Sequence, residues 1–109
     1  MSLLYKSNSL PGFPGTKAGS IKLSGTGYKV LAIFAASSEG SCLAMIPMNW
    51  SITLYSYNTL DSSWCKRAFY LSEDKSKGVT VVEFDDCIGL NNSNKYNTLL
   101  QPIQIYKVM

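Results

Sequence analysis

The chain has 109 residues, of which 46% are hydrophobic and 16% are charged, and its net charge is +3 without any histidine. This length suits one domain, so we expect residues 1–109 to form a single folded unit. The hydrophobic content excludes an intrinsically disordered chain. No apolar run approaches the ~20 residues of a membrane-spanning helix, so we expect no membrane insertion.

Strand patterns recur along the chain, and no segment repeats apolar residues with the period of an amphipathic helix. The first two predicted strands are short and cover residues 3–7 and 20–23. Between them, two Pro-Gly pairs mark turns. Residues 28–35 are almost continuously apolar, which predicts a central strand with Val30, Ile33 and Phe34 buried.

The second half of the chain continues this pattern, with predicted strands at 41–46, 51–57, 64–71, 79–84 and 101–108. Residues 51–57 alternate cleanly. In the strand at 64–71, one face should carry Cys65, Arg67, Phe69 and Leu71, and the opposite face Trp64, Lys66, Ala68 and Tyr70. About eight short strands at roughly 10–12-residue spacing predict an all-β fold, an antiparallel β-sandwich or jelly roll.

The composition offers little for catalysis or metal binding. Histidine, the commonest general base at neutral pH, does not occur in the sequence. Cys42, Cys65 and Cys87 are widely spaced and odd in number, so we expect reduced thiols packed as small hydrophobic side chains. We therefore predict no enzyme, no cofactor and no metal site.

Arg67 falls on the apolar face of its predicted strand. A buried guanidinium needs partners, and Glu83 and Asp85 are the nearest acidic residues by topology. We expect a structural ion pair with one of them. On this basis Arg67→Met should be mild, and removal of the acid alone should cost about 3–5 kcal/mol.

Two tracts combine large amphipathic rings with small polar residues and suit a recognition surface. The candidate ligand-binding residues are Trp50, Tyr55, Tyr57, Trp64, Lys66 and Tyr70. Rings in a β-sandwich also serve as core, so packing remains an alternative for each. Nucleic acid is not an expected partner, because Lys66-Arg67 is the only adjacent basic pair.

The order of these features resembles a known protein class. The relevant segments are Gly-Ser-Ile-Lys-Leu-Ser at 19–24, Gly-Tyr-Lys-Val-Leu-Ala-Ile-Phe at 27–34, Gly-Val-Thr-Val-Val-Glu-Phe at 78–84 and Gln-Pro-Ile-Gln-Ile-Tyr-Lys-Val at 101–108. They are similar to the C-terminal β-sandwich domains of tail-fibre, baseplate and other virion proteins of bacteriophages and prophages. The chain departs from that pattern at Lys107, where a glycine is common.

The resemblance implies a virion-associated module made in the bacterial cytoplasm. Its partner would be a host-surface glycan or protein, or a neighbouring virion subunit, and the module would be a homo-oligomer, in such families often a trimer. The alternative is a small intracellular phage protein that binds and inhibits a host defence or regulatory protein.

Overall fold

The computed structural model describes residues 2–6, 17–37, 40–58, 63–90 and 102–109, and the regular structure in these segments is entirely β-strand. The strands are β1 (Ser2–Lys6), β2 (Gly19–Ser24), β3 (Val30–Ser37), β4 (Gly40–Pro47), β5 (Ser51–Asn58), β6 (Ser63–Asp74), β7 (Val79–Phe84), β8 (Ile88–Gly89) and β9 (Pro102–Lys107). The prediction of an all-β fold is confirmed.

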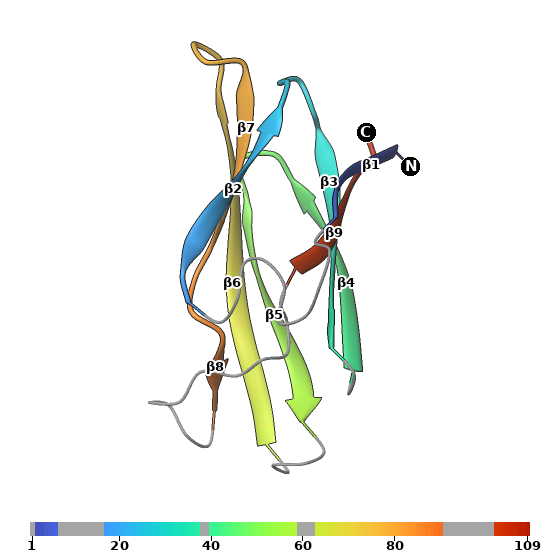
Figure 1. Ribbon diagram of the computed structural model, residues 1–109, viewed down its shortest axis with the longest axis vertical. Coiled ribbons are helices and arrows are strands. Elements are labelled where there is room, and N and C mark those ends of the chain that lie inside the picture. Colours follow the sequence, from blue (N-terminus) through green and yellow to red (C-terminus); the bar gives the residue numbers. More distant parts are fainter. Residues whose placement is uncertain (1, 7–16, 38–39, 59–62, 91–101) are drawn as a thin grey trace.

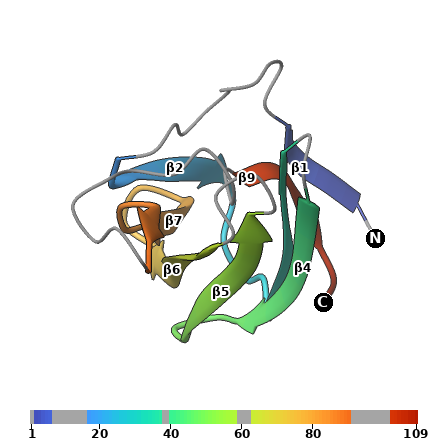
Figure 2. The ribbon, with the colours of Figure 1, turned by 90° about the horizontal axis from the view of Figure 1, so that it is seen from below.

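The strands form two antiparallel sheets that face each other as a β-sandwich (Figure 1). The first, here called the β3 sheet, has the order β1-β9-β3-β4. The second, the β6 sheet, has the order β2-β7-β6-β5, and β8 pairs with β6 beyond the end of β7. At one edge β4 and β5 lie side by side, where the chain passes from the first sheet to the second (Figure 2).

The core lies between the sheets because alternate residues of each strand point inward. Both sheets contribute apolar side chains to it, namely Ile21, Leu23, Leu31, Ile33, Ala35, Ala44, Ile46, Leu54, Cys65, Phe69, Leu71, Val82, Phe84, Cys87 and Ile105. The inward face predicted for residues 64–71 matches β6, since Cys65, Arg67, Phe69 and Leu71 are all buried.

β3 is central in its sheet, between β9 and β4, as predicted. Ile33 is fully buried, but Val30 and Phe34 are only half-buried, so the prediction was wrong for these two. The reason is alternation: Leu31 and Ile33 point into the core, whereas Val30 and Phe34 point to the outer face of the β3 sheet. The second sheet covers only the inner face.

Candidate functional site

The outer face of the β6 sheet carries most of the side chains that the sequence singles out for ligand binding. β5 contributes Tyr55 and Tyr57, β6 contributes Trp64, Lys66 and Tyr70, and all five are exposed. In the strand register Tyr55 lies opposite Lys66, and Tyr57 lies opposite Trp64. The rings of Tyr57 and Trp64 meet edge to face with centroids 5.3 Å apart. We call these five residues the platform.

Trp50 does not belong to the platform. Its side chain is 68% exposed, but it precedes the first residue of β5, directly after a turn in which Asn49 adopts φ 67°. The carbonyl of Trp50 accepts a 3.0 Å hydrogen bond from the N–H of Leu71, a residue that points into the core. In the alternation along β5, position 50 therefore falls with the residues that face the core, whereas Tyr55 falls with those that face outward.

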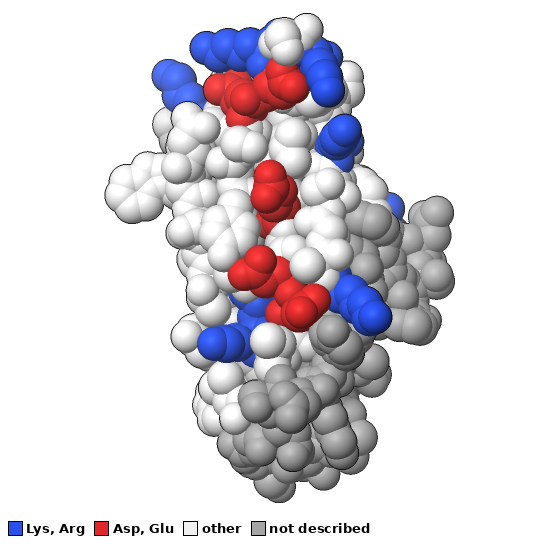
Figure 3. Space-filling model, turned by 90° about the vertical axis from the view of Figure 1, so that its left-hand side faces the viewer, with Lys and Arg blue, Asp and Glu red and all other residues white. Residues whose placement is uncertain are grey.

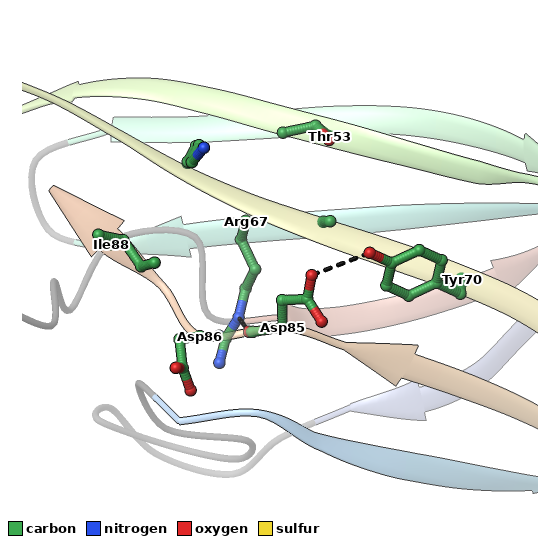
Figure 4. A pocket seen from close by; sticks show the side chains of 8 residues that line it. Thr53, Arg67, Tyr70, Asp85, Asp86 and Ile88 are labelled. Atoms are coloured by element: carbon green, nitrogen blue, oxygen red, sulfur yellow. Dashed lines mark hydrogen bonds between the residues drawn. The ribbon is translucent and has the colours of Figure 1, made fainter. Parts of the chain in front are cut away.

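A pocket of about 300 Å³ opens beside the platform (Figure 4). It is lined by Thr53, Lys66, Arg67, Ala68, Tyr70, Asp85, Asp86 and Ile88. The pocket lies where β7 ends and β8 begins, because the connecting residues leave the regular ladder beside β6. One bond still fixes this connection, since the N–H of Asp85 donates to the carbonyl of Ala68 at 3.0 Å. Lys66 and Tyr70 belong to both the platform and the pocket.

Tyr70 and Asp85 form a side-chain hydrogen bond across the pocket wall (Figure 4). The Tyr70 hydroxyl donates to a carboxylate oxygen of Asp85 at 2.9 Å. This bond is the main cause that raises the pKa of Tyr70, and the negative charges of Asp85 and Glu83 add to it. The phenol therefore stays protonated at neutral pH and holds the carboxylate in one orientation.

Arg67 lies beneath the pocket and is only 1% exposed. Its Nε donates to the carbonyl of Asp85 at 2.8 Å, and one terminal nitrogen donates to the carbonyl of Lys17 at 3.0 Å. The guanidinium carbon also lies 4.9 Å from the centroid of the Phe84 ring, within cation–π range. Arg67 thus ties β6 to the segments that follow β7 and precede β2.

Burial lowers the pKa of Arg67, and the negative charges of Cys87, Asp86 and Asp85 oppose that effect. Figure 4 shows the guanidinium between the side chains of Asp85 and Asp86. Glu83 lies elsewhere: it is exposed and pairs with Tyr70 in the register, on the outer face. The strand position of Glu83 therefore points away from Arg67. An ion pair between Arg67 and Asp85 stays a prediction.

Acidic side chains run along the face formed by β6 and β7, with basic side chains around them (Figure 3). Within the part of the chain that the structure describes, the acidic residues are Glu73, Asp74, Glu83, Asp85 and Asp86.

Sequence reasoning missed four residues that line the pocket: Thr53, Ala68, Asp86 and Ile88. Thr53 alternates with Leu54 on β5, so its outward direction was readable, but nothing marked it as part of a concave site. Asp86 and Ile88 owe their place to the short β8, which has no sequence signal of its own.

Searches for a metal site, a membrane-spanning helix and similar proteins assign no function to the chain. In the described segments no group of three or more Cys, Asp or Glu side chains is placed to hold a metal ion. No helix among the same residues has the length and apolarity to cross a membrane. Comparison with protein-family models, curated proteins and solved structures gives no match to this chain.

Proposed function

We propose that this chain is a non-catalytic binding module that holds a saccharide on the outer face of the β6 sheet. The observation that carries the proposal is the pocket, which places oriented polar groups directly beside exposed aromatic rings. A sugar ring has an apolar C–H face and a rim of hydroxyls, so it needs both kinds of contact. At about 300 Å³ the pocket is at the lower end of ligand sites, which suits one sugar ring.

Each pocket residue has a role in this proposal. The carboxylate of Asp85, held by Tyr70, accepts hydrogen bonds from sugar hydroxyls. The ammonium of Lys66 and the hydroxyl of Thr53 supply donors on the other side. Tyr57 and Trp64 extend the surface away from the pocket, where a second sugar ring would stack.

The two tryptophans give a matched test. The protein is applied to an array of bacterial surface oligosaccharides, and the best-bound saccharide is then titrated against variants by calorimetry. Trp64→Ala should weaken binding at least tenfold, about 1.4 kcal/mol. Trp50→Ala removes an equally large exposed ring outside the platform and should leave the affinity unchanged. No array signal, or equal losses in both variants, would reject the proposal.

The virion setting is a second part of the proposal, and its support is the resemblance in strand order described above. In that setting the saccharide belongs to a bacterial surface. Labelled protein should bind whole cells of a host strain, and periodate oxidation of the cell-surface glycans should abolish this binding. If protease treatment of the cells abolishes it instead, the partner is a surface protein and the saccharide proposal fails.

The homo-oligomer implied by the same resemblance would use the other sheet. On its outer face Leu3, Leu43 and Met45 are each more than half exposed. Lys6 is the one charged side chain that the register places on this face among the described residues, so two copies could meet there without strong repulsion. Sedimentation should give an oligomer, and Leu43→Lys should convert it to a monomer.

A further inference from the structure

The pocket beside the platform is hollow because a small residue lies at its centre. The register places Ala68 of β6 opposite Thr53 of β5, and the Asp85 N–H donates to the Ala68 carbonyl from the other side. Along β6, the neighbours of Ala68 on the same outer face are Lys66 and Tyr70, whose side chains are much longer. Ala68 therefore forms the floor of the pocket, and Lys66 and Tyr70 stand at its two ends.

The Tyr70 end of the pocket carries negative charge. The Tyr70 hydroxyl donates to Oδ2 of Asp85 at 2.9 Å, and Figure 4 shows the carboxylate turned toward that hydroxyl. Oδ1 of Asp85 accepts no hydrogen bond from the residues that the structure describes. Glu83 lies opposite Tyr70 on the same face and adds a second carboxylate to this end. A group that supplies N–H donors and a positive charge is the complement of this end.

The Lys66 end of the pocket carries positive charge. Lys66 and Tyr70 are four residues apart, so their Cα atoms are separated by about 13 Å at the ordinary rise of a strand. The cross-strand neighbours of Lys66 are Tyr55 and Ile88, which are both uncharged. Within the described segments Lys66 is exposed and has no ion-pair partner. Its ammonium and the Asp85 carboxylate do not neutralise each other, because Tyr70 holds the carboxylate toward the opposite end.

The remaining charged residues of the pocket are engaged by main-chain groups. Asp86 accepts a 2.8 Å hydrogen bond from the N–H of Ala18. Arg67 is buried beneath the pocket, where its donors reach the carbonyls of Asp85 and Lys17. The two charges left for a ligand are thus the carboxylate at one end and the ammonium at the other.

We propose that the pocket selects a zwitterionic sugar, a refinement that rests on the saccharide binding proposed above. The ammonium of the sugar lies against Asp85, its carboxylate or phosphate lies against Lys66, and its ring covers Ala68 between them. Each charged group of the sugar then meets the opposite charge. A neutral sugar offers only hydroxyls at both ends. Since ion pairs in partly exposed sites contribute little each, the selectivity comes from two pairs acting together.

Four sugars with the same ring separate the two charges. Glucosamine 6-phosphate carries both, glucosamine only the ammonium, glucose 6-phosphate only the phosphate, and glucose neither. Each is titrated into the isotope-labelled full chain and followed by NMR at slightly acidic pH, where the amine is protonated and the phosphate is anionic. Each charge should raise the affinity by about threefold to fivefold, so the zwitterionic sugar should bind about ten times more tightly than glucose, or better.

Single substitutions assign each charge to its end. Lys66→Met should remove the gain from the phosphate and keep the gain from the ammonium, and Asp85→Asn should do the reverse. Asparagine keeps an oxygen for the Tyr70 hydroxyl, so the shape of this end is preserved. Lys77→Met removes an exposed cation from the turn after β6 and is the control, which should change none of the four affinities. Ala68→Leu fills the floor and should weaken all four.

The outcomes distinguish this refinement from the proposed function. Four equal affinities, or a zwitterionic sugar that binds no better than glucose, would overturn the charge selection, while a saccharide bound on the array would still support the proposed function. Gains that survive both Lys66→Met and Asp85→Asn would likewise overturn only the charge selection. If neither the array nor glucosamine 6-phosphate shows binding, both proposals fail.

Discussion

Arg67 contributes both to the packing of the sandwich and to the shape of the pocket. Its side chain occupies a core position on β6, yet its donors reach the carbonyls of Asp85 and Lys17. These carbonyls belong to residues that lie outside the strands, just before β2 and just after β7. A charged donor that satisfies such groups stabilises the fold and also sets the position of the pocket wall.

This geometry reverses the expectation drawn from the sequence for Arg67→Met. Methionine keeps the apolar stem but leaves two main-chain carbonyls without their donors, which should cost about 1–3 kcal/mol. Asp85→Ala keeps the carbonyl that Arg67 binds and should be the milder change. Lys66→Met, one position away on the exposed face, serves as the control and should stay within about 0.5 kcal/mol. Urea unfolding measures all three, and a mild Arg67→Met would contradict the assigned contacts.

The bond between Tyr70 and Asp85 makes a prediction about pH. Because the raised pKa of Tyr70 favours its protonated form in the folded chain, the contribution of this bond is complete below the ordinary tyrosine pKa of 10.0. It is lost as the pH rises through the higher folded-state pKa. Asp85→Ala should lower the pKa of Tyr70 toward 10.0, and Glu83→Gln should lower it less. Titration of ring-labelled tyrosines by NMR checks the order, and equal effects would refute it.

At the scale of strands, the faces that point to the core were predicted from the alternation of residues along each strand. The opposite faces of β5 were readable because its residues switch between apolar and polar with a period of two, and those of β6 followed from placing alternate residues of a strand on opposite faces. The limits of β6 were less readable: the strand continues to Asp74, since Glu73 and Asp74 pair with Thr80 and Val79 despite their charge. β8 could not be foreseen, because a two-residue strand exists only through its tertiary pairing with β6.

The same limit applies to the site. Five of the six candidate ligand-binding residues share a face because they occupy alternate positions along β5 and β6. This spacing can be read from the sequence. The pocket instead depends on the place where β7 leaves β6, which is set by the fold as a whole. Contacts between distant segments follow from topology, and topology was predicted only as far as a sandwich or jelly roll.

Two leucines on neighbouring strands test which face of the β3 sheet is buried and which is exposed. Leu31 on β3 is 0% exposed, whereas Leu43 on β4 is 56% exposed. Leu31→Ala should destabilise the chain by about 2–5 kcal/mol, because it removes buried apolar contacts and leaves a cavity. Leu43→Ala should change the free energy of unfolding of the monomer by no more than about 0.5 kcal/mol. Urea titrations at low protein concentration compare them, and similar losses would contradict the assignment of faces.

At the scale of the whole molecule, the two sheets present unlike outer faces around one shared core. The β6 sheet exposes charged, hydroxyl and aromatic groups around the pocket, whereas the β3 sheet exposes aliphatic side chains such as Leu43 and Met45. Both sheets bury their inner faces against each other, so neither is expected to remain folded when the other unfolds. A ligand held by one sheet must therefore stabilise the entire chain.

The stabilisation of the whole chain by a ligand on one sheet can be measured without knowledge of the binding pose. The best-bound array saccharide, present at one hundred times its dissociation constant, should stabilise the folded state by about 2.7 kcal/mol. For a chain of this length that corresponds to a rise in melting temperature of roughly 10 °C. Trp50→Ala should retain the rise, and Trp64→Ala should lose about half of it or more at the same saccharide concentration because its affinity is at least tenfold lower. A saturated complex that melts at the temperature of the free protein would show that the saccharide binds the unfolded chain equally well, which is incompatible with a site built by the folded β6 sheet.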